Sequence, residues 1–404
     1  MNKKNIIKLI ILLSICTSLT AESNVNFSGE IETRWGAVLP WTDSNSSAGR
    51  FLLGDTSLTG KLDAYYNNSS ALAEGSVSYD AVKDNLNFSL KEIWFDYTLD
   101  SWGIRVGRQK TAWGKADGID ITNVICPSDM SSFSAMTSDD NKLAIDALRF
   151  SLTGNQFTAD AFWIPFFTPA PITLNAKKPE AALWNGEYAL KVSGYFSALD
   201  VSFYSFYGWD DTPFLNNTVA NSASTSSSPA LPSGKNVSGE YKRMTMIGFD
   251  TALPIKETVL RAETAFFPMR HFQKSAGNTE QHNELSSLVG LDWMPAEWTF
   301  TAQYYFDYLF GSIDALERAD SYHHGITLNI SKTLLNETLK LSLSGLLGFN
   351  DFDSMIHPSV SYSLSDQITL TAGAYIFLPG PEYDGKYGKY KDQSCIIIGG
   401  KFSF

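Results

Sequence analysis

Hydrophobic and polar side chains alternate along most of the chain with a period of two residues. In "WTFTAQYYFDYLF" (298–310) one parity is mainly aromatic, whereas the other carries Thr301, Gln303 and Asp307. The stretches "QITLTAGAYIF" and "TLKLSLSGLLGF" repeat the pattern. Successive side chains of a β-strand point to opposite faces, so each stretch predicts a strand with one apolar and one polar face. These strands are longer than the roughly five or six residues typical of globular sheets.

Short and long connections alternate between the predicted strands. Tight turns are expected near 67–69, 99–101, 154–155, 197–199, 254–256, 295–296, 335–336 and 364–366. Longer polar segments are expected near 39–50, 81–85, 114–143, 166–186, 210–240, 268–283, 310–320, 349–352 and 378–391. The spacing predicts about 18 strands, within a range of 16–18, and it puts both chain ends on the side of the short turns.

Long alternating strands with short turns at one end and long loops at the other are typical of a transmembrane β-barrel. A bilayer offers the backbone no hydrogen-bond partners, so a sheet can span it only when it is closed on itself. The sequence therefore predicts an all-β, antiparallel, up-and-down barrel with short periplasmic turns and long extracellular loops. Its last strand, "CIIIGGKFSF", ends in Phe404 and resembles the terminal signal that the barrel assembly machinery recognises.

The first 21 residues have the features of an export signal. Three lysines precede the short apolar run "LIILLSIC", and "SLTA" suits cleavage after Ala21. Lipidation at Cys16 is the less favoured alternative, because Ile15 before it is larger than the usual residue. We expect a signal peptide at 1–21 and a single barrel domain at 22–404, located in the outer membrane of a diderm bacterium.

The charge of the chain argues against some partners. Without the signal, 28 basic residues face 43 acidic ones, a net charge of −15, which argues against nucleic acid as a partner. Cys126 and Cys395 remain after processing, and the sequence leaves open whether they pair. No nucleophile motif accompanies the histidines, and the adjacent His323 and His324 point to opposite faces of a strand. The sequence therefore predicts no enzyme, no cofactor and no metal site.

The polar face of the strands carries charges of both signs. By parity it includes Glu30, Glu32, Arg34, Lys61, Asp63, Glu74, Arg105, Arg149, Asp160, Lys191, Arg261, Glu263, Asp307 and Lys340. So many charges cannot lie in a dry core unless each is paired, whereas a barrel of this size can hold water.

In the strand near 86–99 the apolar parity changes. A β-bulge at Lys91–Glu92 would restore it and would turn Trp94 and Asp96 inward. A charge pair across the strands is then expected, either Asp96–Arg105 or Glu92–Arg108.

One segment resembles a known family. "RVGRQKTAWG" followed by "NVICPSD" is similar to outer-membrane barrels of the porin-like type, in which an Arg-x-Gly-Arg-Gln run leads into Trp-Gly and an Asn-Pro-x-Asp-like turn. The matching residues are Arg105, Gly107, Arg108, Gln109, Trp113, Gly114, Asn123, Pro127 and Asp129. The chain departs from the pattern by separating Asn123 from Pro127. The resemblance implies an outer-membrane location and passive transport, and it names no substrate.

We therefore predict a porin-like channel for small solutes, narrowed by the loop 114–143 folding inward. Its partners would be outer-membrane lipids, the diffusing solutes and the assembly machinery; the oligomeric state stays open. The expected pore-lining and constriction residues are Arg105, Arg108, Gln109, Asp96, Glu92, Arg149, Asp117, Asp120 and Asp129. Arg108 has the parity of the lipid-facing residues. Its side chain either turns inward through a bulge at Gly107 or lies at the level of the lipid headgroups. A surface adhesin or structural barrel is the alternative function, and an outer-membrane hydrolase is the least favoured one.

Overall fold

The computed structural model describes residues 24–39, 48–131, 133–137, 141–172, 175–215, 238–275, 277–381 and 385–404. The predicted signal at 1–21 lies outside the described residues, and so does the low-complexity segment 216–236. In the described part of the chain, no helix is long and apolar enough to cross a membrane.

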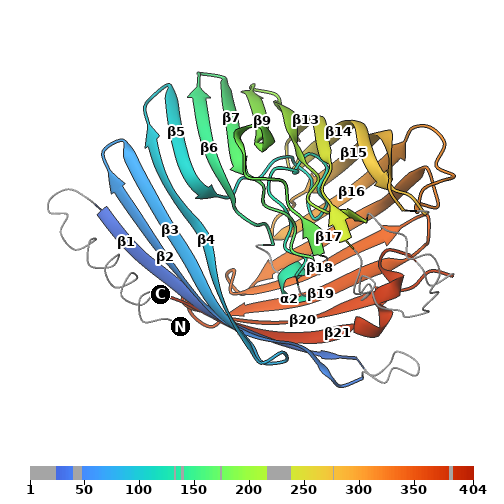
Figure 1. Cartoon of the computed structure of the whole chain (residues 1–404). Helices are drawn as coiled ribbons and strands as arrows, with labels where there is room; N and C mark the ends of the chain where they lie inside the picture. Colours follow the sequence, from blue (N-terminus) through green and yellow to red (C-terminus); the bar gives the residue numbers. More distant parts are fainter. Residues whose placement is uncertain are drawn as a thin grey trace.

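Eighteen antiparallel strands form one closed sheet, because the first strand pairs with both the second and the last (Figure 1). The strands of this barrel are β1 (Asn24–Val38), β2 (Phe51–Tyr66), β3 (Ser69–Asp80), β4 (Asn85–Thr98), β5 (Trp102–Gln109), β6 (Ile145–Thr153), β7 (Phe157–Phe166), β9 (Glu187–Tyr195), β10 (Asp200–Trp209), β13 (Arg243–Ile255), β14 (Thr258–Gln273), β15 (Thr279–Trp293), β16 (Trp298–Leu309), β17 (Tyr322–Leu334), β18 (Leu339–Gly348), β19 (Ser354–Ser363), β20 (Ile368–Leu378) and β21 (Cys395–Ser403).

The connecting segments carry a few short elements. The strands β8 (Asn175–Lys177), β11 (Phe214–Leu215) and β12 (Ser238–Glu240) form a separate three-stranded sheet. The short helices are α2 (Phe133–Met136), η2 (Leu183–Asn185) and η3 (Gly388–Gln393).

The predicted fold class is confirmed, with 18 strands and a tight turn at each of the eight expected places. The prediction of a long loop at 268–283 is wrong, because β14 continues to Gln273 and β15 begins at Thr279. A bulge between Phe267 and Arg270, with Met269 at a φ of 50°, interrupts the alternation there. The bulge and Pro268 break the alternation of apolar and polar residues although the strand continues, and for this reason the sequence resembled a loop.

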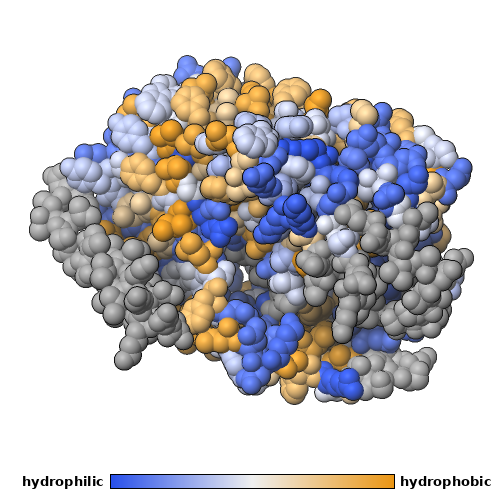
Figure 2. Space-filling model, viewed as in Figure 1, coloured by the Kyte–Doolittle hydropathy of each residue, from blue (hydrophilic) through white to orange (hydrophobic). Residues whose placement is uncertain are grey.

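The outside of the barrel is apolar. Phe27, Phe88 and Ile398 are 66%, 65% and 54% exposed, although each lies within a regular strand. Figure 2 shows hydrophobic side chains spread over the strands in the upper part of the view. An exposed apolar band around a closed barrel is what the hydrocarbon core of a bilayer requires.

The predicted bulge in β4 is confirmed. Glu74 pairs with Glu92 while the next residue, Gly75, pairs with Leu90, so Lys91 is the extra residue. Phe88 and Leu90 before the bulge are exposed on the outside, and so are Ile93 and Phe95 after it. The bulge thus keeps both halves of β4 in the same orientation toward the membrane.

Deletion of Lys91 should prevent assembly of the barrel, because one half of β4 must then turn its apolar face inward and its charged face to lipid. Each charge moved to the lipid face costs about 2–4 kcal/mol at the bilayer centre. We expect the heat-modifiable band of the folded barrel to disappear on gels. The substitution Lys91→Ala is the control, since it keeps the bulge, and a folded barrel from the deletion variant would contradict the explanation.

Candidate functional site

The segment between β5 and β6 folds into the barrel instead of covering its rim. It leaves the wall after Gln109, crosses the lumen and returns to Ile145, and Figure 1 shows it with α2 inside the ring of strands. Its contacts reach β10, β14, β16 and β20, which belong to several sides of the barrel. We call residues 110–144 the lumen loop.

A buried carboxylate on the wall holds the lumen loop. Glu263, on the inward face of β14, is 2% exposed. One carboxylate oxygen accepts the backbone N–H of Lys115 (2.6 Å) and of Ala116 (2.8 Å). The other accepts both the N–H and the hydroxyl of Thr122, each at 2.7 Å. Four donors around one buried charge replace its lost hydration, so the loop conformation and the ionised carboxylate support each other.

Three further wall residues bind the same part of the loop. The amide of Gln303 accepts the N–H of Asp117 at 2.9 Å and donates to the carbonyl of Asp117 at 2.7 Å. The guanidinium of Arg261 donates to the carbonyl of Lys115 at 2.9 Å. The hydroxyl of Tyr204 accepts the N–H of Gly114 at 3.2 Å and donates to Asp250. These contacts pin residues 114–122 from three strands at once.

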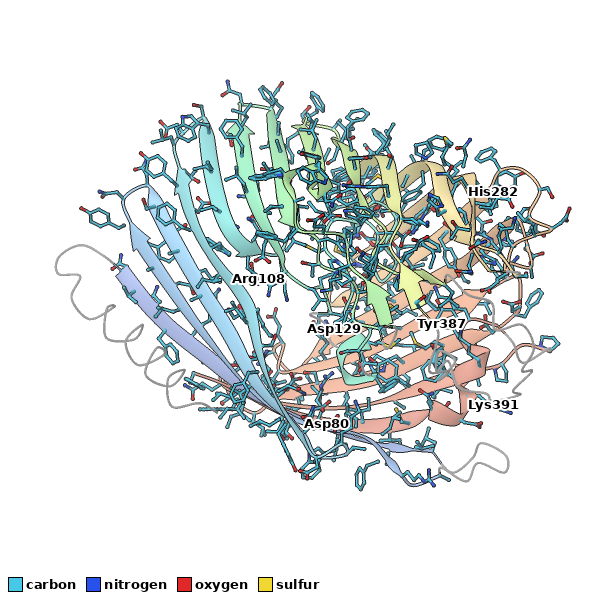
Figure 3. All side chains as sticks on the ribbon, in the orientation of Figure 1. Asp80, Arg108, Asp129, His282, Tyr387 and Lys391 are labelled. Carbon is cyan, nitrogen blue, oxygen red and sulfur yellow. The ribbon has the colours of Figure 1, made fainter. Side chains whose placement is uncertain are left out.

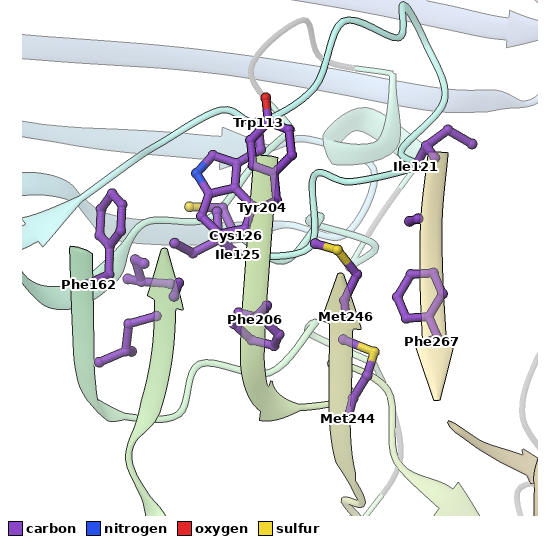
Figure 4. Close-up of a cluster of buried hydrophobic side chains, with 14 of the residues drawn as sticks. Trp113, Ile121, Ile125, Cys126, Phe162, Tyr204, Phe206, Met244, Met246 and Phe267 are labelled. Carbon is purple, nitrogen blue, oxygen red and sulfur yellow. The ribbon is translucent and has the colours of Figure 1, made fainter. Parts of the chain in front are cut away.

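Apolar packing fixes the loop on the same side of the lumen (Figure 4). The ring of Trp113 lies 5.0 Å from that of Tyr204 and 6.4 Å from that of Phe162. Ile121, Ile125 and Cys126 of the loop pack against a buried cluster whose wall members include Phe206, Met244, Met246, Ala265, Phe267 and Leu288. Burial of each large apolar side chain contributes about 1.5–3 kcal/mol. The inner faces of β7–β15 are therefore filled by the loop.

The tip of the loop reaches the opposite wall. Phe133 of α2 packs edge-on against Tyr375 of β20, with ring centroids 5.6 Å apart. The guanidinium of Arg34, on β1, donates to the carbonyl of Thr137 at 3.5 Å. The lumen loop thus spans the barrel from β14 to β20 and β1.

The lumen is divided into a packed half and an open half. Many inward side chains of β9–β16 are buried, as for Ser193, Asp250, Glu263 and Gln303, which are at most 4% exposed. Many inward side chains of β1–β4 and β18–β21 are half-buried or exposed, as for Lys61 and Thr371, although Asp96 and Cys395 are buried. The wall made by β1–β4 and β18–β21 is therefore the part of the lumen with the more accessible polar side chains.

Charges on the open wall form pairs across or along the strands. The distances between the charged atoms are 2.6 Å for Lys401–Glu30, 2.9 Å for Arg105–Asp96, 3.5 Å for Lys61–Asp63, 3.7 Å for Lys91–Glu74 and 3.8 Å for Arg34–Glu32. Partly hydrated pairs of this kind contribute little to stability, about 0–1 kcal/mol each. They give the wall a nearly balanced charge.

Three of the predicted site residues form one cluster. The expected pair Asp96–Arg105 is present, and the guanidinium of Arg105 also lies over the ring of Trp94, 3.8 Å from its centroid. Arg149, the register partner of Arg105, lies 3.8 Å from both Asp96 and Asp160. Two arginines thus share the buried carboxylate of Asp96 on the inward face of β4–β6.

The alternative pair, Glu92–Arg108, does not form. Arg108 pairs in register with Ile93, whose side chain is exposed on the outside, and it binds Asp146 at 3.2 Å. The register continues without a shift at Gly107, so Arg108 lies on the outer face at the loop end of β5 (Figure 3). Glu92 faces inward and accepts the N–H of Lys110 at 2.9 Å. The two side chains are on opposite faces of the sheet.

Gln109 faces inward as expected but does not meet water. It is 1% exposed, and its amide donates to the carbonyl of Ala147 at 2.9 Å. The lumen loop covers this end of β5, which the parity of the strand alone could not reveal.

The predicted loop acids lie apart from the wall arginines. Asp120 accepts the ammonium of Lys142 at 2.6 Å, and Asp129 caps the N–H of Ser131 at 2.9 Å (Figure 3). The side chain of Asp117 is exposed, and only its backbone is held, by Gln303. Arg105 and Arg108 pair instead with Asp96 and Asp146 of the wall, and the residues that anchor the described loop lie on β10, β14 and β16.

Sequence reasoning placed Glu263 on the inward face but missed its role as an anchor. A signal was present, because Asp250 and Glu263 are register partners and both are acidic. Two adjacent buried acids without a basic partner between them require donors from elsewhere. The loop supplies these donors through its backbone, which a charge pattern does not show.

Other candidate chemistry gives no second site. Within the described part of the chain, no group of three or more His, Cys, Asp and Glu side chains is arranged to hold a metal ion. Cys126 and Cys395 are both buried and free. At the extracellular mouth, Arg270 joins Asp210 and Glu284, each at 2.9 Å, and so ties the segment after β10 to β14 and β15.

Comparison with known proteins gives a likeness in structure alone. No model of a known protein family matches the sequence, and no curated protein matches it. OccAB3 of Acinetobacter baumannii matches with a TM-score of 0.56 and 9% identity, over 94% of this chain and 99% of that chain. OccK2 (OpdF) of Pseudomonas aeruginosa matches with a TM-score of 0.55 and 8% identity, over 95% and 97%. The chain shares the barrel fold of these Occ proteins. A mutant porin of Rh. blastica matches with a TM-score of 0.46 and 10% identity, over 94% of this chain and all of the other.

Replacing Glu263 should release the lumen loop and expose Cys126 to thiol reagents. Burial raises the pKa of the Cys126 thiol to about 11. In the intact loop the thiol is therefore both protonated and shielded at pH 8; release lowers its pKa toward the ordinary value and increases the reactive thiolate. In a Cys395→Ala background, Glu263→Ala should accelerate maleimide labelling at least roughly tenfold, because a buried hydrogen-bonded charge is lost.

Labelling is followed by mass spectrometry of the folded barrel in detergent. The variant Glu257→Ala is the matched control, since this carboxylate lies in the short turn between β13 and β14. Equal labelling rates in both variants would show that Glu263 does not hold the loop.

Proposed function

We propose that the protein is an outer-membrane channel through which small solutes diffuse passively. The observation that carries the proposal is the divided lumen, in which half-exposed charged and hydroxyl side chains line one half while the lumen loop packs the other. A barrel built only for stability has no reason to leave so many polar groups in water. The barrel fold shared with the Occ proteins is compatible with the same function.

In this proposal the lumen loop narrows the channel. The loop crosses the barrel between β14 and β20, and a solute must therefore pass between its exposed side and the open wall. The cluster of Asp96, Arg105 and Arg149 and the exposed acids Asp117 and Asp120 would face this passage from different sides. Arg108 and Gln109 would not contact solutes, because one lies on the outer face and the other is buried.

The proposal includes the route by which the chain reaches its membrane. Export by the segment 1–21, assembly through the terminal strand ending in Phe404, and contact with outer-membrane lipids through the apolar band together account for those parts of the sequence. No specific observation favours an adhesin, and the histidines give none that favours a hydrolase: His282 and His357 hydrogen-bond to backbone carbonyls, and His324 bonds to Tyr304.

Removing the tip of the lumen loop should widen the channel. We expect deletion of residues 118–138 to raise the single-channel conductance in planar bilayers at least roughly twofold, because the loop occupies the lumen of a barrel otherwise wide enough for an aqueous pore. Glu263→Ala, which releases the loop without deleting it, should increase the current noise and the mean conductance as well. An unchanged conductance in both folded variants would place the narrowest part elsewhere.

Neutralising Asp96 should shift the ion preference toward anions. Asp96→Asn removes the carboxylate that Arg105 and Arg149 share and leaves two cations facing the lumen. The zero-current potential in a KCl gradient should move by several millivolts in the anion-selective direction, with less change at high salt because of screening. Asp366→Asn, in the short turn between β19 and β20, is the control and should leave the potential unchanged.

A further inference from the structure

The inward faces of β17–β20 carry neighbouring short hydroxyl side chains. Ser331, Ser342 and Ser359 are consecutive partners in register, and so are Ser361 and Thr371 one row nearer the short turns. These residues alternate with side chains that are exposed on the outside, such as Leu341, Leu343 and Leu370. We call the set the hydroxyl wall; it consists of Ser331, Thr333, Ser342, Ser344, Ser359, Ser361, Ser363, Thr369 and Thr371.

The hydroxyls of this wall are not engaged by the protein. Across the ranges that the structure describes, none of the nine makes a side-chain hydrogen bond, and all nine are half-exposed or exposed. Inward hydroxyls in the part of the lumen that the loop packs are engaged, as in Ser193, which bonds to Ser202 at 3.0 Å, and Thr301, which donates to Asp292 at 2.9 Å. On the open side, Ser57, Ser76 and Ser78 of β2 and β3 are unengaged as well, but they lie among charged side chains such as Lys61 and Glu74. The hydroxyl wall therefore offers donors and acceptors that only water or a solute can use.

The remainder of the open half behaves differently. Its charges are paired with one another, as in Lys401–Glu30 and Lys61–Asp63, so a passing ion must compete with an existing partner. Lys340, a register neighbour of Thr333 and Ser361, lies in the second position of β18 beside the short turn. Beyond this lysine, toward the lumen loop, the hydroxyl wall is uncharged.

Short hydroxyls at sheet spacing suit one kind of solute. Partners across strands lie about 4.5–5.5 Å apart and neighbours along a strand about 7 Å apart, which is the scale of a sugar ring. Each solute hydroxyl can exchange a bond to water for a bond to Ser or Thr at small net cost, while a solute with few hydroxyls leaves the wall hydrated and gains nothing. For a charged solute, the free energy of the hydration that it loses is larger than the free energy that hydrogen bonds to neutral hydroxyls provide.

We propose that the hydroxyl wall makes the channel selective for neutral polyhydroxylated solutes, that is, sugars and polyols, over solutes of equal size with few hydroxyls. This inference rests on the proposed channel function and adds a solute class to it. The wall lowers the barrier along one side of the passage, and the lumen loop holds solutes against it from the other.

The test compares swelling of proteoliposomes in a hexose and in tetraethylene glycol, two neutral solutes of similar mass. With the full-length processed chain we expect the hexose to enter faster than the glycol, after correction for liposomes without protein. In Ser342→Ala/Ser361→Ala/Thr371→Val the ratio of hexose to glycol entry should fall about threefold, as expected for the loss of a few weak hydrogen bonds. The KCl conductance should remain unchanged, because the substitutions alter neither charge nor backbone.

The matched control removes three hydroxyls from the outer face. Thr33, Thr56 and Thr264 share the parity of exposed apolar residues, and Thr33→Val/Thr56→Val/Thr264→Val should keep the ratio of the parent. A parent that conducts ions but admits both solutes equally would overturn the solute class alone. Slowing of both solutes by the same factor in the inward variant would overturn it as well. A folded parent without conductance or swelling would overturn the channel itself.

Discussion

A bilayer gives the peptide backbone no hydrogen-bond partners, and this constraint determines most of the structure. The last strand, β21, must return to β1, and it does so through nine register pairs from Glu30–Ser403 to Val38–Cys395. Closure removes the two open edges that a sheet of 18 strands would otherwise present to lipid. It also creates an inside, whose diameter at 18 strands exceeds what side chains alone can fill. The lumen loop fills part of this wide interior.

The lumen loop depends on one buried carboxylate more than on its own sequence. The described part of the lumen loop has the short helix α2 as its only named element, so fixing the loop costs much conformational entropy and strong anchors are required. Glu263 supplies the strongest one, because four donors converge on an ionised group that is out of water. Removal of that group would leave the donors unsatisfied as well. The aromatic contacts of Trp113 then select which side of the lumen the loop fills.

Much of the barrel could be predicted from the sequence, and the reason is physical. A period of two is the direct result of strand geometry between lipid and water, so strand number, turns and even the Lys91 bulge were readable. The candidate site was readable only where neighbouring strands determine it, as for Asp96 and Arg105. Contacts between a loop and distant strands leave no periodic trace. For this reason Gln109 was expected in water although it is buried, and the anchors of the loop were not recognised.

The asymmetry of the lumen follows from the asymmetry of these anchors. Wherever the loop is packed, polar side chains are bonded to protein atoms, as Gln303 is to Thr327 and to the loop. Where the loop does not cover the wall, the inward polar groups must form their hydrogen bonds with water or with each other. They include paired charges on β1–β4 and short hydroxyls on β17–β20. Paired charges hold on to their partners, whereas hydroxyls exchange partners at little cost. Because the lumen loop is anchored on the opposite side, the hydroxyl wall is left as the part of the lumen that is most accessible to a neutral solute.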